Sequence, residues 1–216
     1  MEFKTVSLAD RVFETLEKNI LNGTYKRGEV ISEKRLTEEL VVSRTPIREA
    51  LNRLMEEDLI EDSPNGTVVC GMTPADVADA YEVKRRMEVL AARRAAKNIT
   101  EDELRYMKEL VEQAEFYAQK NDADKVRDMD TQFHDALYDA SRSRVLRRIL
   151  RPLHHKIMRY RKASLEQHES RLKESVEEHI QILGALETHD EDKVETLMMV
   201  HIQHAQNSIS NIEEEK

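Results

Sequence analysis

The feature that most constrains the fold of this chain is a change of hydrophobic periodicity near residue 71. Before it, three stretches with apolar residues at helical spacing are followed by two short runs rich in β-branched residues. After it, helical spacing continues without strand signals to about residue 209. With five glycines and four prolines among 216 residues, few positions interrupt these helices. The pattern predicts a mainly α chain in two parts.

The first part contains three predicted helices. The first carries an apolar stripe from Leu8 to Ile20 and ends at Gly23. Ser32 is a candidate N-cap for a short second helix, and Ser43 for a third. The inward positions of the third helix are Ile47, Ala50, Leu51, Leu54 and Met55.

A β-hairpin is predicted after the third helix. Leu59-Ile60 and Thr67–Cys70 are short strand-like runs on either side of the turn sequence Ser63–Gly66. Three helices followed by a hairpin are typical of a winged helix-turn-helix. We therefore assign residues 1–71 to such a domain.

The second part is predicted to be an all-α antiparallel six-helix bundle. Residues 72–75 form a linker, and residues 76–216 form the bundle. Thr100 and Glu103 have the spacing of a capping box. The expected helices run from about Thr73 to Asn98, Thr100 to Lys120, Asp122 to Ala140, Arg144 to Lys162, Arg171 to Thr188, and Asp190 to Ile209.

The third helix has a polar face suited to DNA. Arg44, Arg48 and Asn52 follow at four-residue intervals and lie opposite the apolar stripe. Arginine at the start of a helix can bind a guanine edge, and the hydroxyls of Ser43 and Thr45 can hold phosphates. The alternative is a solvated face. Net charge gives no support to DNA binding, because residues 1–71 carry 10 Lys and Arg against 14 Asp and Glu.

The bundle sequence places four metal-binding side-chain types on apolar faces. Asp130 and His134 lie at i and i+4 beside Phe133 and Leu137, and His179 and His201 fall on the inward stripes of their own helices. Buried polar groups need partners, and a divalent ion would satisfy these four. Spacing alone leaves two interpretations open, a metal site or satisfied core histidines.

The sequence Val42–Leu51, with Ser32–Leu36 before it, resembles the signature of the GntR family of bacterial transcription regulators. Asp58-Leu59-Ile60 and the turn at Gly66 also resemble the wing of that family. The resemblance implies DNA contacts by five residues and a homodimer on a palindromic operator in double-stranded DNA. These five residues are Lys34, Arg44, Thr45, Arg48 and Gly66.

Most of residues 76–209 resemble the FCD effector-binding domain of FadR-type members, in the shorter, VanR-like form. The resemblance implies that Asp130, His134, His179 and His201 bind a divalent metal ion, and that the ion holds a small carboxylate effector. Zinc is favoured, with nickel and manganese as alternatives. The family's effector-binding arginine is replaced by Lys84, and Arg85 is a candidate substitute.

The remaining sequence features are five further histidines, the length of the apolar runs and the single cysteine. Most of His154, His155, His168, His189 and His204 are expected at the surface. Apolar runs reach only four residues, so no membrane span is expected, and a single cysteine, Cys70, agrees with a reducing cytoplasm.

The sequence leaves three functions to compare. The first is a regulator, more often a repressor in this family, that responds to a carboxylate metabolite. The second is a DNA-binding protein whose metal is only structural. The third is a helical-bundle metalloenzyme, which lacks support because no Glu-x-x-His pair occurs. We therefore predict a protein that is not an enzyme.

Overall fold

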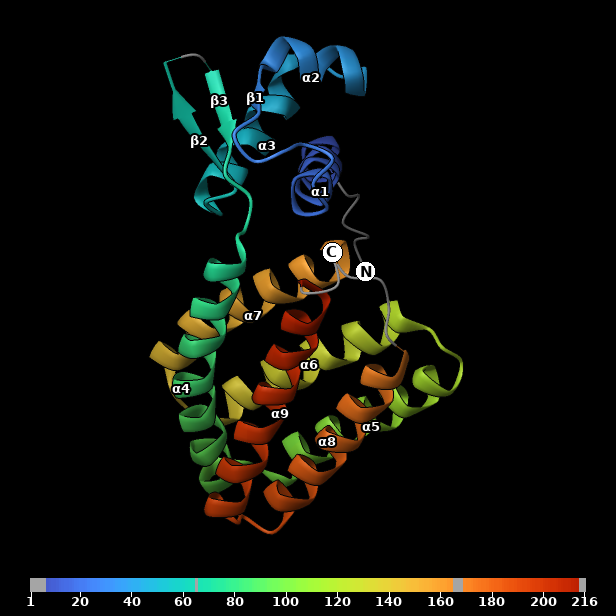
Figure 1. Cartoon of the computed structure of the whole chain (residues 1–216). Coiled ribbons are helices and arrows are strands. Elements are labelled where there is room, and N and C mark those ends of the chain that lie inside the picture. Colours follow the sequence, from blue (N-terminus) through green and yellow to red (C-terminus); the bar gives the residue numbers. More distant parts are fainter. Residues whose placement is uncertain (1–6, 65, 165–168, 214–216) are drawn as a thin grey trace. The chain divides into compact units, whose positions relative to one another are not determined.

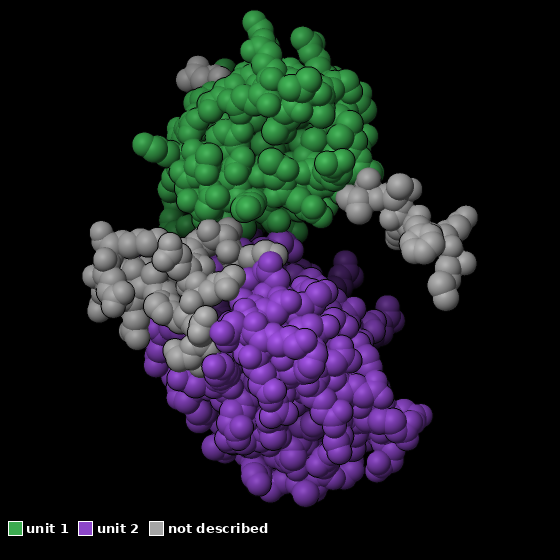
Figure 2. Space-filling view, turned by 90° about the vertical axis from the view of Figure 1, so that its right-hand side faces the viewer, with its two compact units in different colours: residues 1–73, 162–164 green, residues 74–161, 165–216 purple. Residues whose placement is uncertain are grey.

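The computed structural model describes residues 7–64, 66–164 and 169–213. Within these ranges it contains nine helices and three short strands, which confirms the predicted fold class (Figure 1). The chain separates into two compact units, residues 1–73 with 162–164 and the remainder (Figure 2). No helix in the described ranges is both long enough and apolar enough for a transmembrane span.

The N-terminal unit has three helices, α1 (Leu8–Leu21), α2 (Glu33–Leu40) and α3 (Arg44–Glu56). A capping box between Ser7 and Asp10 starts α1, and the Ser32 side chain caps α2. α1 packs against α3 through apolar side chains such as Leu16, Ile47 and Leu54, all fully buried. Burying such side chains stabilises a unit of this size by about 1.5–3 kcal/mol each.

The turn between α2 and α3 contains Val41 in the left-handed region, at φ 54° and ψ 46°. A β-branched residue is rarely found there, because its Cβ crowds the backbone. The Val41 side chain is 88% exposed, so burial does not compensate for this conformation. The turn joins α2 to α3 within three residues, and α3 begins at Arg44.

The wing has three strands rather than the two of the predicted hairpin. β2 (Ile60–Ser63) and β3 (Gly66–Val69) form the hairpin, and β1 (Val30–Ile31) pairs antiparallel with the other edge of β3. The register places Val30 opposite Val68 and Ile60 opposite Val69. β1 therefore connects the segment before α2 to the wing.

The C-terminal unit contains six helices, as predicted. They are α4 (Pro74–Asn98), α5 (Glu101–Gln119), α6 (Ala123–Ala140), α7 (Arg144–Ser164), α8 (Glu169–Glu187) and α9 (Glu191–Glu213). The capping box of Thr100 and Glu103 is present at the start of α5. α4 packs along α9, and α5 packs along α6 and α8. Figure 1 shows α4 and α9, in green and red, running side by side.

Two glycines provide a matched test of backbone strain. Gly66 has φ +120°, and a Cβ there would lie 3.3 Å from Cγ1 of Val30. Gly184 lies inside α8, where an added Cβ meets nothing within 4 Å. We expect Gly66→Ala to lower the free energy of unfolding of the N-terminal unit by about 1–3 kcal/mol, and Gly184→Ala to raise that of the C-terminal unit by about 0.5–1 kcal/mol.

Urea unfolding followed by circular dichroism would measure both changes. Equal effects of the two substitutions would contradict the strain assigned to Gly66.

Candidate functional site

The exposed face of α3 has the expected composition. Arg44, Thr45, Arg48 and Asn52 are exposed, while Ile47, Ala50, Leu51 and Leu54 on the other side are buried. Pro46 in the first turn is buried, whereas the polar side chains beside it at the start of the helix lie outside the core. The face therefore presents two guanidinium groups and an amide to solvent.

Ser43 occupies the N-cap position of α3, but its side chain makes no capping hydrogen bond. The first N–H groups of a helix have no partner within the helix, and they carry the positive end of its dipole. The start of α3 therefore offers backbone donors to an anion, and phosphate is the anion that DNA supplies.

Two of the predicted DNA contacts also have partners within the protein. Nε of Arg48 donates to Oε1 of Glu33 at 2.8 Å, and Nζ of Lys34 lies 4.0 Å from Oε1 of Glu38. The hydrogen bond from Arg48 lowers the pKa of Glu33. Both pairs are solvent-exposed and contribute little to stability, so either cation can exchange its carboxylate for a phosphate. The predicted contact Gly66 lies at the start of β3 in the wing.

In the C-terminal unit, the four predicted metal ligands come together. Asp130 and His134 extend from α6, His179 from α8 and His201 from α9. Their side-chain donor atoms all lie within 4.8 Å of one another. Nε2 of His179 is 3.3 Å from Nε2 of His134 and 3.7 Å from Oδ1 of Asp130. All four residues are at most 9% exposed.

Two carboxylates orient the histidine rings from outside this cluster. Oε1 of Glu88, on α4, lies 2.5 Å from Nδ1 of His134, and Oε2 of Glu178, on α8, lies 2.6 Å from Nδ1 of His201. A carboxylate accepts the Nδ1 proton and leaves the Nε2 lone pair directed at the centre. This arrangement is typical of histidine ligands of metals.

The donor atoms fit a divalent ion. Burial lowers the pKa of His179 and of His201, and neighbouring imidazoles lower both further, so these rings are neutral. Nε2 of His134 and Nε2 of His179 lie 3.3 Å apart, among the donor atoms that could hold one ion. Three imidazole nitrogens and one carboxylate oxygen match the preferences of zinc, nickel and manganese.

Glu88 is itself fully buried and held by three donors. Lys84 forms an ion pair with it, His134 donates from Nδ1, and the Tyr138 hydroxyl donates to Oε1 at 2.6 Å. Burial alone would raise the pKa of Glu88, but Lys84 and His134 hold it well below its usual value. Sequence patterns alone did not single out Glu88, although it continues the buried positions Val77, Tyr81 and Lys84 along α4.

The two predicted effector contacts have protein partners in this structure. Lys84 is 4% exposed and paired with Glu88, and Nη1 of Arg85 lies 3.4 Å from Oε1 of Gln203. A contact of either residue with an effector stays a prediction.

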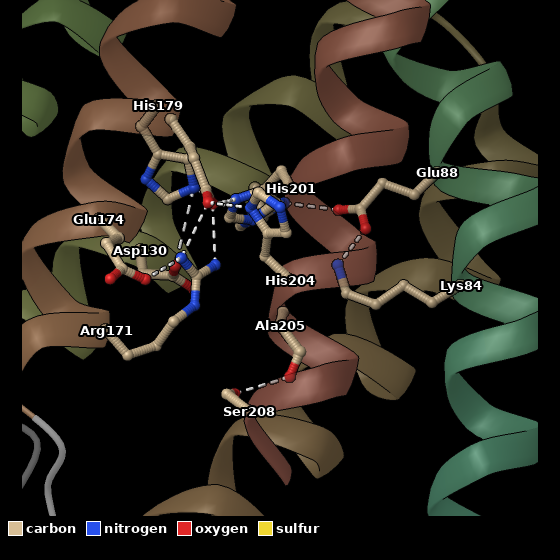
Figure 3. A network of polar contacts seen from close by, with 12 residues as sticks. Lys84, Glu88, Asp130, Arg171, Glu174, His179, His201, His204, Ala205 and Ser208 are labelled. Carbon is tan, nitrogen blue, oxygen red and sulfur yellow. Dashed lines mark hydrogen bonds and ion pairs between the residues drawn. The ribbon is translucent and has the colours of Figure 1, made fainter. Parts of the chain in front are cut away.

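Glu178 is a second carboxylate that sequence patterns alone did not single out. Arg171 donates to both carboxylate oxygens of Glu178 at 2.8 Å, and Figure 3 labels Arg171 together with two further partners of Glu178, His201 and His204. His204 donates from Nδ1 to Oε1 at 2.7 Å. Burial opposes ionisation of Glu178, but His201, Arg171 and His204 lower its pKa strongly. The negative charge of Glu178 is therefore retained next to His201.

His154 is an exception among the five histidines of which most are predicted at the surface. It lies on α7 and is 2% exposed, because it continues the buried positions Leu150 and Ile157 at helical spacing. His155 is half-buried against Asp135, and His189 and His204 are exposed, as expected. His168 lies outside the described residues.

Comparison with known proteins identifies the family. The family model "Bacterial regulatory proteins, gntR family" matches residues 8–69, and the FCD domain model matches residues 79–204. The chain belongs to the GntR family. It is a DNA-binding transcription regulator rather than an enzyme, so the metalloenzyme alternative is set aside.

Several relatives of this regulator have assigned names. The HTH-type transcriptional repressor RspR of Escherichia coli is 27% identical over 212 residues, covering 98% of this chain and 92% of that protein. The gluconate operon transcriptional repressor of Bacillus subtilis is 31% identical over 130 residues, 60% of this chain and 54% of that protein. Among solved structures, E. coli McbR/YncC shares the fold, with a TM-score of 0.72, 24% identity and coverage of 98% of this chain and 100% of that one.

The carboxylate support of His201 gives a prediction for this regulator. Glu178→Gln removes the charged acceptor of the Nδ1 proton, so we expect about 10- to 100-fold weaker zinc binding. Glu174→Gln, one turn earlier on α8, is the matched control, because Glu174 is exposed and contacts only Arg171 among the residues of this network. Competition with a chromophoric chelator would measure both affinities. Equal zinc affinity of the two variants would contradict the assigned role of Glu178.

Proposed function

We propose that this regulator is a repressor whose affinity for its operator is controlled by a small carboxylate bound at a divalent metal ion, with zinc favoured. It acts as a homodimer on a palindromic operator in double-stranded DNA. The observation that carries the proposal is the cluster of three buried imidazoles and Asp130, with Glu88 and Glu178 orienting two of the rings. RspR and the gluconate operon regulator are both named as repressors.

Asp130, His134, His179 and His201 are the residues that would hold the ion. The ion would supply a positive centre with open positions for oxygen ligands. With four protein ligands from α6, α8 and α9, an ion that expands to five or six ligands would keep a position for an oxygen ligand, whereas a strictly four-coordinate zinc would be closed.

The chain offers a direct connection from this centre to the DNA-binding unit. Glu88 and Lys84 lie on α4, and α4 begins at Pro74, shortly after β3 of the wing ends at Val69. A ligand that binds one arrangement of α4 better than another shifts the equilibrium between them. By linkage, the same ligand then changes affinity for the operator.

The decisive experiment measures operator binding in four states. The duplex is selected from a random library by the wild-type protein, and affinity is measured with zinc-loaded or chelator-treated protein, with and without a panel of small hydroxy- and dicarboxylates. We expect at least one carboxylate to change the affinity of the zinc-loaded protein by about 5- to 150-fold, and that of the chelated protein by much less.

A metal that is only structural gives a different result. Chelation would then lower the melting temperature, while no carboxylate would change operator binding. Native mass spectrometry of the same samples tests the homodimer, and a monomer bound to a single half-site would contradict it.

The reading role of α3 is tested by Arg44→Ala. Losing a bidentate arginine contact to a base is expected to weaken binding to the selected duplex by about 1–3 kcal/mol, or roughly 5- to 150-fold, and to relax sequence preference at one position. Lys108→Ala, at an exposed position of α5, removes the same charge far along the chain and serves as the control. A uniform loss over all sequences would instead assign Arg44 to a phosphate.

A further inference from the structure

Arg48, an exposed arginine of α3, is held by a carboxylate from the preceding helix. Its Nε donates to Oε1 of Glu33 at 2.8 Å. Glu33 is the first residue of α2, whereas Arg48 lies in the second turn of α3, so the contact joins the two helices. The side chain of Arg48 is 61% exposed and that of Glu33 is 35% exposed. The pair is therefore accessible to a ligand that approaches α3.

A role in stability explains this pair poorly. An exposed ion pair between two long side chains gains little, because solvent screens it and both side chains lose freedom. Glu33 also lies in the first turn of α2, where a carboxylate interacts favourably with the helix dipole. That start is already capped by the Ser32 hydroxyl, which accepts from the backbone N–H of Arg35. Neither effect requires Glu33 to reach across to α3.

The contact leaves Arg48 able to bind a base. The hydrogen bond lowers the pKa of Glu33 and raises that of Arg48, so both groups are charged at neutral pH. A guanidinium has five N–H donors in one plane, and with Nε held by Glu33 the four donors on Nη1 and Nη2 remain. Two of these are enough for the two acceptors on the edge of a guanine. The carboxylate also fixes the plane of the guanidinium, so less side-chain freedom is lost on binding.

A DNA phosphate competes with Glu33 for the same guanidinium. Arg48 can exchange Glu33 for a phosphate, but the exchange leaves the carboxylate without its partner beside a polyanion. Binding of a base through the two Nη groups avoids this cost, because the pair is kept. Residues 1–71 carry 10 Lys and Arg against 14 Asp and Glu, so the unit as a whole also gains little from sequence-independent attraction.

We propose that Glu33 is a positioning residue for sequence recognition, which holds Arg48 for a guanine edge and makes binding of that arginine to a phosphate less favourable. Glu33 itself contacts no base, and its effect on discrimination passes through Arg48. This inference rests on the reading role of α3 in the proposed function. It is independent of the metal ion and of a carboxylate effector.

The same helix offers a matched control. Glu38 also lies on α2, and its Oε1 is 4.0 Å from Nζ of Lys34, with both side chains largely exposed. Glu38→Gln removes the same charge as Glu33→Gln but releases no arginine of α3. A general electrostatic effect would change DNA affinity alike in the two variants, whereas the positioning role affects only Glu33→Gln.

The test compares two duplexes bound by the full-length protein. One is selected from a random library by the wild-type protein, and the other is a scrambled duplex of the same length and composition. Discrimination is the ratio of the two dissociation constants. We expect Glu33→Gln to lower it by at least about fivefold, the lower end of what one bidentate base contact contributes, and Glu38→Gln to keep it within about twofold of wild type.

Two further readouts follow from the release of Arg48 in Glu33→Gln. The scrambled duplex should bind this variant more tightly and with a steeper salt dependence, because the arginine adds a phosphate contact. A selection repeated with Glu33→Gln should show relaxed preference at one position of each half-site. A merely structural role of Glu33 would change neither the salt dependence nor the preference at a single position.

The variant Arg48→Ala shows whether the effect passes through Arg48. Arg48→Ala alone should lower discrimination. Adding Glu33→Gln to it should change the ratio by less than about twofold, because the side chain that Glu33 positions is gone. An equal loss from Glu33→Gln in both backgrounds would overturn the inference.

The remaining outcomes separate this inference from the proposed function. Discrimination that is unchanged in Glu33→Gln, or lowered as much in Glu38→Gln, overturns the inference. A lower melting temperature of Glu33→Gln than of Glu38→Gln would assign Glu33 to the start of α2 and also overturn it. If Arg48→Ala changes the affinity for neither duplex, the inference is wrong, while control by a carboxylate is still decided with zinc-loaded and chelated protein. If only Glu33→Gln loses discrimination and no carboxylate affects operator binding, the proposed function alone fails.

Discussion

The stability of the C-terminal unit depends on the partners of the ionisable side chains that it buries. Glu88, Asp130 and His134 are buried in a helical core, where each would be costly without partners. Glu88 is stabilised by Lys84, His134 and Tyr138, and Glu178 by Arg171, His201 and His204. These two carboxylates fix the orientation of two imidazoles of the cluster. The centre is therefore largely preorganised by its outer contacts.

The same contacts join helices that are far apart in the sequence. Glu88 brings α4 to α6, and Glu178 brings α8 to α9. α4 also follows the wing in the chain. The helix that carries Glu88 in the C-terminal unit is therefore the helix that connects this unit to the N-terminal one. A DNA-binding protein with an acidic net charge thus combines an exposed arginine face on α3 with a chemically distinct helical unit that has a polar core.

Hydrophobic periodicity predicted the helices well, because each buries one continuous stripe. It also placed Asp130, His134, His179 and His201 on inward faces. The strand β1 was missed because two residues, Val30 and Ile31, carry no periodicity and form a strand only by pairing with β3. Glu88 and His154 were missed for a different reason. Both lie on inward stripes. The role of a charged or imidazole side chain there follows from its contacts with residues of other helices, which the pattern of a single helix does not contain.

The connection between the units is short. The N–H groups of Cys70 and Gly71 both donate to the carbonyl of Leu59, which ties these residues to the N-terminal unit. Only Met72 and Thr73 then remain before α4 begins at Pro74. Two residues span roughly 7 Å at most, so the two units are joined by a short linker. In the proposed homodimer, a linker this short would tolerate little variation in the number of base pairs between half-sites, and the spacing of the operator would become part of what the protein recognises.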